Sequence, residues 1–317
     1  MLVRRLLPIA CMSIMVGLCM TAVPAQPDLF RMAESFGSSP FIGNGGSWSV
    51  EGGGLTSGQF LYDAQTHSLV THVDSRLATT KLVRPLPRTL SGTDSFEFGA
   101  LLRIDSNGFH ASPYGFFEIA FGLINSQTTG TDRVGVGSGN DDTYDALEWD
   151  FYPNVSPIFG GPSVGPTAIG GRSGSAWYDN FAFDFGPSTD LHNEIAAGLL
   201  PPTGLPLDTP LKIRLRYDAA DQTVALDIRA FEDGQWQTLP INVPPLDASG
   251  LDPSFIVDQI AISLYNDPMN PSQQDPSLTA TVRYSEIYVQ SLASEQTWTT
   301  RPKTAAPIVD GLIAVPK

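Results

Sequence analysis

The stretch Leu211-Lys212-Ile213-Arg214-Leu215-Arg216-Tyr217 alternates strictly between apolar and basic side chains. Turn-forming residues occupy positions 218–222, and Val224, Leu226 and Ile228 then alternate with Ala225, Asp227 and Arg229. Side chains of a β-strand project alternately to opposite faces, so each run presents one apolar face and one polar face. The two runs predict a β-hairpin in which Asp227 lies across from an arginine on the polar face.

Similar strand patterns recur along most of the chain, separated by clusters of Gly, Pro, Asn and Asp. They cover residues 47–50, 79–83, 95–104, 116–124, 146–152, 181–185, 256–265 and 281–290. Helical patterning is confined to residues 190–200, where Asp190 is a candidate cap and Pro201 and Pro202 end the segment. Many short strands without an internal linker predict an all-β, two-sheet antiparallel sandwich rather than a parallel α/β sheet.

The first 25 residues have the features of a secretory signal peptide. Arg4 and Arg5 precede a mostly apolar stretch at 6–20, and the small residues of Val23-Pro24-Ala25 follow it. A membrane anchor is the alternative, but the stretch is shorter than the about 20 residues that cross a bilayer. We expect cleavage after Ala25, an extracellular, periplasmic or cell-surface location, and no membrane insertion of the mature chain. Residues 26–292 would then form the sandwich, and residues 293–317 an extended tail.

Both cysteines, Cys11 and Cys19, lie in the predicted signal peptide. The mature chain would therefore have no disulfide, no thiolate metal site and no cysteine nucleophile. An exported domain of this kind must be held together by its apolar core, and its length is sufficient for one.

The chain is acidic, with a formal net charge of −15. It lacks a Lys/Arg cluster that could attract a phosphate backbone, so nucleic acid is excluded as a partner. Neutral polysaccharides, cations and other proteins are the partners that this charge favours. Solubility outside the cell would also account for the acidity.

Three segments carry a resemblance to a known superfamily. They are Gly46-Ser47-Trp48-Ser49-Val50 near the start, the hairpin over residues 211–231, and Tyr284-Ser285-Glu286-Ile287-Tyr288-Val289 near the end. Their order resembles the concanavalin A-like lectin/glucanase superfamily. The resemblance implies a jelly-roll sandwich whose closing strand returns beside the first. Many members bind sugars on the concave sheet or its rim, some hydrolyse glycans, and others only mediate adhesion.

The sequence Glu148-Trp149-Asp150-Phe151-Tyr152 places Glu148, Asp150 and Tyr152 on one face of a strand. It resembles the Glu-x-Asp start of the motif of laminarinase-type glycoside hydrolases. That resemblance implies that Glu148 is a nucleophile tuned by Asp150. Tyr152, however, stands where those enzymes carry the acid/base Glu.

A retaining glycosidase needs two carboxyl groups about 5–5.5 Å apart, and a tyrosine is a poor proton donor near neutral pH. Glu118, on a neighbouring predicted strand, could approach Glu148 and supply the second carboxyl group. Alternatively, Glu148 and Asp150 line a hydrophilic face or bind loop backbone. We therefore expect a non-catalytic domain, with glycan hydrolysis through Glu148 and Asp150 as the alternative.

Sugar binding requires an exposed aromatic ring beside planar polar groups. The segment Trp177-Tyr178-Asp179-Asn180, after the Gly-rich residues 160–174, offers this combination. Tyr152 with Asn154 is a second candidate. The alternative is that these aromatic side chains belong to the core, where aromatic residues beside strands more often lie.

Acidic residues in the loop at 139–145 raise the question of calcium, with Asp141, Asp142 and Asp145 as candidate ligands. The loop lacks the spacing of an EF-hand, and Asp/Asn/Gly runs are also ordinary turn sequences. The sequence requires no cofactor and leaves calcium open. It favours a secreted lectin-like domain that binds a glycan or surface polymer. A structural envelope protein without a small ligand remains a further alternative.

Overall fold

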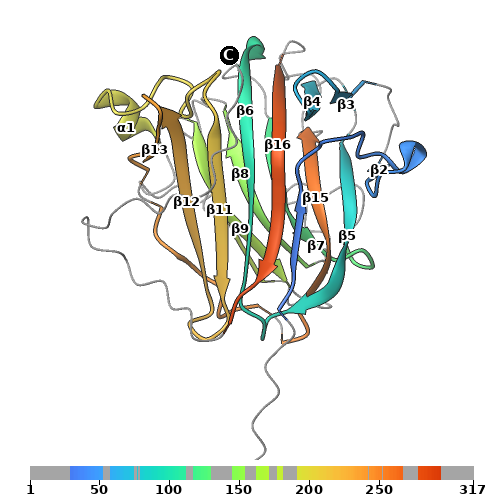
Figure 1. The fold of residues 1–317 in the computed structure, drawn as a ribbon. Helices are drawn as coiled ribbons and strands as arrows, with labels where there is room; N and C mark the ends of the chain where they lie inside the picture. The colour runs from blue at the N-terminus through green and yellow to red at the C-terminus, as the bar shows by residue number, and fades with distance from the viewer. Residues whose placement is uncertain are drawn as a thin grey trace, which may run out of the picture.

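The computed structural model describes residues 29–52, 58–74, 77, 79–111, 117–129, 145–153, 162–170, 177–180, 191–241, 243–251, 253–266 and 278–293. These residues form two antiparallel sheets that lie face to face (Figure 1). The prediction of an all-β, two-sheet antiparallel sandwich is confirmed. The predicted signal peptide lies outside the described residues, as do the predicted strand at 181–185 and all but the first residue of the predicted tail.

The larger sheet has nine strands and is called the large sheet below. Its strands, in spatial order, are β13 (Gln235–Thr238), β12 (Thr223–Glu232), β11 (Leu211–Asp218), β6 (Phe96–His110), β16 (Thr279–Ser291), β4 (Ser68–Asp74) and β3 (Phe60–Asp63). Strand β1 (Arg31–Glu34) pairs with β16, and β14 (Leu246–Asp247) pairs with β12. The predicted hairpin is β11–β12, and Arg214 lies opposite Asp227 in it. As the resemblance implied, the last strand lies beside the first.

The second sheet has seven strands and is called the small sheet. Its order is β10 (Trp177–Asn180), β9 (Ser163–Gly170), β8 (Ala146–Tyr152), β7 (Phe117–Ile124), β15 (Ile256–Asn266), β5 (Thr80–Ser91) and β2 (Ser49–Gly52). The helical segments of the described chain are the 3-10 turn η1 (Ile42–Asn44) and the short helix α1 (His192–Ala196). Helix α1 covers only the middle of the predicted segment 190–200.

The core lies between the sheets and follows the alternation of the strands. Phe98 on β6 contacts Phe121 on β7 edge-to-face, with 6.1 Å between ring centroids. On the small sheet, Phe121 packs against Trp149 at 5.4 Å, and Trp149 stacks on Phe151 at 6.2 Å. These side chains are fully buried, and burial of each contributes about 1.5–3 kcal/mol to folding. Trp149 and Phe151 are therefore core residues, and their neighbours Glu148 and Asp150 face the other way.

Two parts of the sandwich differ from the sequence prediction. The Gly-rich stretch at residues 160–174, which the sequence predicts to be a loop, contains strand β9. It forms a strand because Val164 and Ala168 bury their side chains in the core. The β3–β4 hairpin was also not predicted. Its turn begins at Asp63, whose carboxylate accepts a hydrogen bond from the backbone N–H of Gln65.

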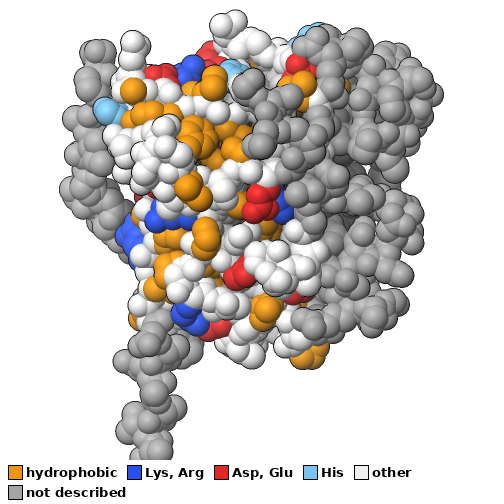
Figure 2. All heavy atoms as spheres, turned by 90° about the vertical axis from the view of Figure 1, so that its right-hand side faces the viewer, with side chains coloured by type: hydrophobic (Ala, Val, Ile, Leu, Met, Phe, Trp, Pro, Cys, Tyr) orange, Lys and Arg blue, Asp and Glu red, His pale blue; other side chains and the backbone are white. Residues whose placement is uncertain are grey.

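The edge of the sandwich where β3, β4, β5 and β2 lie shows charges of both signs interspersed with apolar side chains (Figure 2). No single-sign patch dominates the described residues of this view. In the described part of the chain, no helix has the length and hydrophobicity needed to cross a membrane.

Candidate functional site

Three carboxylates meet on the outer face of the small sheet, the face turned away from the core. Glu118 comes from β7, and Glu148 and Asp150 come from β8. One carboxylate oxygen of each residue lies within 4.8 Å of those of the other two. We call these three residues the acidic cluster. Its members are 3%, 0% and 0% exposed, in the order given.

Small residues on β7 make room for the cluster. Glu148 lies opposite Gly122 and Asp150 opposite Ala120 in the β7–β8 ladder. A Cβ atom on Gly122 would lie 2.6 Å from Cγ of Glu148, which is closer than real contacts allow. The Glu148 side chain therefore lies directly over Gly122, and the missing side chain at that position is what admits it.

The neighbouring strands supply polar groups around the cluster. Thr167 on β9 lies opposite Glu148, and its hydroxyl donates a hydrogen bond to Oδ2 of Asp150. On β5, Lys81 is 3% exposed, donates to the backbone oxygen of Thr129 at 3.2 Å, and lies 3.7 Å from a carboxylate oxygen of Glu51. The lysine charge is thus paired with Glu51 on the neighbouring strand β2 (Ser49–Gly52).

A buried group of carboxylates repels itself when all members are ionised. Burial also removes the water that stabilises each charge, at a cost of several kcal/mol per ion. Shared protons, hydrogen-bond donors, a cationic side chain or a bound cation can each stabilise such a group. Clustered carboxylate oxygens are the ligands that calcium prefers, so Glu118, Glu148 and Asp150 could hold a divalent cation.

The same geometry provides the second carboxyl group that the sequence motif lacks. Glu118 approaches Glu148, as the sequence analysis suggested it could. Tyr152, which stands in the position of the motif's acid/base residue, is buried at 3% exposure. A glycosidic bond, however, would have to reach groups that are 0–3% exposed.

The predicted sugar-binding segment is strand β10, at the edge of the small sheet, and the structure describes the backbone of its four residues. Asn180 lies opposite Thr167, which in turn lies opposite Glu148. Strand β9 thus lies between β8 and the segment that contains Trp177, Tyr178, Asp179 and Asn180. The fold brings together two features that are separated by about thirty residues in the sequence. Asn154 lies outside the described residues.

Among the predicted calcium ligands, the structure describes Asp145, which is 2% exposed. Its Oδ2 atom accepts hydrogen bonds from Nδ2 of Asn125 at 3.1 Å and from the backbone N–H of Ile256 at 3.2 Å. Asp145 therefore ties the start of β8 to β7 and β15. Asp141 and Asp142 lie outside the described residues.

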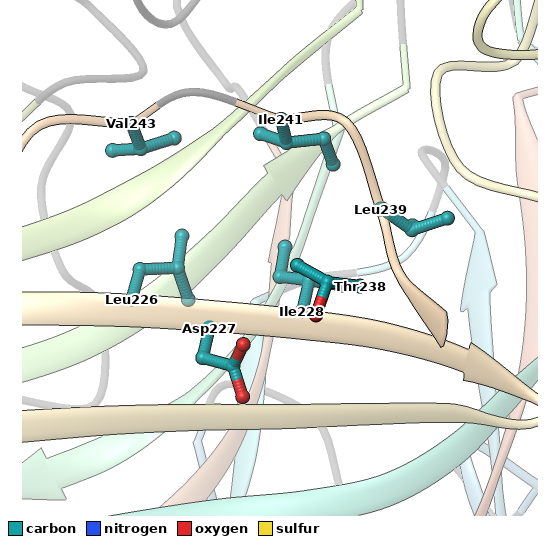
Figure 3. Close-up of a pocket in the computed structure, with 7 residues that line it drawn as sticks. All are labelled: Leu226, Asp227, Ile228, Thr238, Leu239, Ile241 and Val243. Atoms are coloured by element: carbon teal, nitrogen blue, oxygen red, sulfur yellow. The ribbon is translucent and has the colours of Figure 1, made fainter. Parts of the chain in front are cut away.

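A small pocket lies between β12 and the segment after β13 (Figure 3). It has a volume of about 40 Å³ and is lined mainly by the aliphatic side chains of Leu226, Ile228, Leu239, Ile241 and Val243. The pocket is too small for a sugar ring and is not the candidate site.

No family model matches the sequence, and no curated protein is significantly similar to it. Several solved structures resemble the fold. Basic winged bean lectin with Tn-antigen has a TM-score of 0.49 at 10% identity, over 84% of this chain and 99% of that one. The lumenal domain of VIP36, in a Ca²⁺/Man2-bound form, has a TM-score of 0.45 at 11% identity, over 86% and 92%. The β-glucanase of Bacillus licheniformis has a TM-score of 0.37 at 11% identity, over 82% and 97%.

One of these neighbours is a lectin and one is a β-glucanase. Likeness at such identities concerns the fold, and the function has to be argued from the residues of the site itself.

Proposed function

We propose that residues 26–292 form a secreted, non-catalytic domain that binds a neutral glycan at the β9–β10 edge of the small sheet. The observation that carries the proposal is the row Asn180–Thr167–Glu148, which puts β10, the strand that carries the candidate residues, in the same sheet as the acidic cluster with only β9 between them. Glycan recognition uses aromatic rings for the C–H faces of a sugar and amides or carboxylates for its hydroxyl groups. The excess of acidic residues disfavours nucleic acid and anionic lipid as partners.

Within this proposal, calcium neutralises the acidic cluster and stabilises the strands that carry the binding edge. The support is the approach of three buried carboxylates to within 4.8 Å of one another. The hydrogen bond from Thr167 to Asp150 links the cluster to β9, the strand that pairs with β10. Binding of a cation here would therefore stabilise the edge to which the glycan binds.

The glycan proposal is tested by affinity electrophoresis in neutral polysaccharides and by a glycan array. Trp177→Ala should weaken retention about tenfold, equivalent to about 1.4 kcal/mol. Leu199→Ala is the matched control, because Leu199 is 60% exposed and lies after α1, outside the small sheet. Equal retention of wild type and Trp177→Ala on every polysaccharide that binds would contradict the proposal.

The calcium proposal has a readout independent of glycan binding. Calcium should raise the thermal midpoint of the wild type, and a chelator should reverse the shift. Asp150→Asn and Glu148→Gln should abolish the response while the protein remains folded. A wild type that shows no shift and contains no metal by elemental analysis would contradict the calcium proposal.

A glycan-cleaving hydrolase is the second candidate, favoured by the position of Glu118 beside Glu148. It predicts release of reducing ends from a neutral polysaccharide such as a β-glucan. Glu148→Gln and Glu118→Gln should each abolish that release. Activity that persists in both variants would exclude this pair as the catalytic groups.

A further inference from the structure

An exposed aromatic pair lies on the large sheet, away from the acidic cluster. Phe231 on β12 lies opposite Trp236 on β13. Their ring centroids are 5.2 Å apart with an interplanar angle of 57°, and the two residues are 40% and 39% exposed. Because Ala230 is buried in the core, the alternation of β12 directs Phe231 to the outer face of the sheet.

The hairpin that carries the pair is tight. Glu232 pairs with Gln235, which leaves Asp233 and Gly234 as a two-residue turn. Both have positive φ values, 50° and 78°, as a type I′ turn requires and as the Asp-Gly sequence favours. The N–H of Leu239 donates to the backbone oxygen of Ile228 at 3.0 Å and extends the ladder. The two rings are therefore held in position before any ligand arrives, which lowers the entropic cost of binding.

A polar group suited to a hydroxyl ligand lies beside the rings. Thr238, two residues after Trp236, is exposed on the same face of β13 and lies opposite Arg229. Further along the same face, Asp227 is engaged by Arg214 at 2.6 Å and by Arg229 at 3.0 Å. A hydroxyl group thus lies beside the aromatic rings, while the nearby charges pair with one another.

The size and charge of this surface favour a sugar over a protein. Among the described residues, the other large exposed apolar side chains are Leu29, Ile42, Leu61, Leu199 and Ile256, and none of them lies on β11, β12 or β13. Two half-exposed rings fall well short of the about 800 Å² that each partner buries in a stable protein interface. Glu232 and Asp233 lie next to the rings in a chain of net charge −15, which disfavours an anionic ligand.

We propose that Phe231 and Trp236 form a second glycan-binding surface, which stacks against neutral pyranose units while Thr238 binds a hydroxyl group. The surface lies on the large sheet, whereas the β9–β10 edge belongs to the small sheet. One molecule would then hold a polysaccharide at two separate places, and the second contact strengthens retention on a polymer more than on a short oligosaccharide. This inference goes beyond the function proposed above and does not depend on it.

The test is affinity electrophoresis of the mature chain in a β-glucan and in a galactomannan, with polygalacturonate as the anionic comparison. Trp236→Ala should weaken binding to the neutral polymer about tenfold, and Trp236→Tyr should retain most of it because a ring remains. Leu61→Ala is the matched control, since Leu61 is 45% exposed on β3 at the opposite edge of the same sheet. Thermal midpoints within about 2 °C of the wild type would show that the variants are folded.

The outcomes separate this inference from the proposed function. Loss of binding in Trp236→Ala but not in Trp177→Ala supports the second surface and contradicts the β10 site. Loss in Trp177→Ala alone overturns the second surface. A wild type that binds no neutral polymer overturns both. A concentration-dependent dimer in sedimentation that Trp236→Ala abolishes would make the pair a contact between copies and overturn the glycan assignment.

Discussion

At Gly122, the smallest change of side chain should have a large effect on the acidic cluster. A Cβ atom there would lie 2.3 Å from the backbone oxygen of Leu147 and 2.6 Å from Cγ of Glu148. Gly122→Ala should lower the free energy of unfolding by about 1–3 kcal/mol, because the strands must separate to accommodate it, and it should remove the calcium response. Gly43→Ala is the control, since a Cβ atom at Gly43 meets nothing within 4 Å. A urea titration that shows equal effects of the two variants would contradict this account of Gly122.

His72 should make stability sensitive to acid. Burial lowers its pKa, and the charge of Arg283 lowers it further, against an opposing effect of Asp105. The folded state therefore binds the proton less tightly than the unfolded state, whose histidine pKa is about 6.5. The resulting stability is present above that pH and is lost as the pH falls.

This effect is measured by urea unfolding of wild type and His72→Gln at pH 5 and pH 8. The wild type should lose more stability on acidification than His72→Gln does. His67→Asn should keep the wild-type difference, because His67 lies in the exposed β3–β4 turn. If His72→Gln lost as much stability between pH 8 and pH 5 as the wild type does, other groups would be responsible for the acid sensitivity.

At the scale of elements, the β11–β12 hairpin shows how far sequence can lead. Its strict alternation predicted both strands and the pairing of Asp227 with an arginine, because the polar faces of two adjacent strands must coincide. The hairpin β12–β13 was not anticipated. Residues 232–238 contain no alternating apolar pattern, and only the tertiary structure reveals that Trp236 meets Phe231.

The Gly-rich strand β9 and the cluster show the same limit. The Gly-rich composition of residues 160–174 is typical of a loop. Part of the segment nevertheless forms a strand, because the tertiary structure buries Val164 and Ala168. The residue Thr167 therefore had no recognisable role in the sequence. The sequence suggested that Glu118 could approach Glu148. Only the register of the β7–β8 pair shows that their carboxylates meet.

Removal of Asp227 should weaken the β11–β12 hairpin. Its Oδ2 atom accepts hydrogen bonds from Nη2 of Arg214 at 2.6 Å and from Nε of Arg229 at 3.0 Å. Asp227→Ala should cost about 1–2 kcal/mol, since the side chain is 10% exposed but both arginines are partly solvated. Thermal or urea unfolding measures the loss, and the Arg214→Ala double variant should show less than the sum of the two single losses. If the two single losses simply added in the double variant, a direct interaction between Asp227 and Arg214 would be contradicted.

For the whole molecule, stability should be independent of redox conditions. The two cysteines lie within the first 25 residues, so a chain cleaved after Ala25, as we propose, has no disulfide to break. The thermal midpoint of protein isolated from the culture supernatant should be the same with and without a reducing agent, and its N-terminal residue should be Gln26. A fall in the midpoint on reduction would contradict cleavage at that point, since it would require a cysteine to remain.

The order in which the large sheet is completed has a consequence for synthesis. Strand β16 is the last strand of the chain that the structure describes, yet it lies between β6 and β4 in the middle of that sheet. Until residues 279–291 leave the ribosome, β6 and β4 have no partner between them, and the ladders on either side cannot join. Pairings between such distant segments form slowly. The large sheet of the nascent polypeptide should therefore stay incomplete until residues 279–291 have been synthesised, however early the strands before them are made.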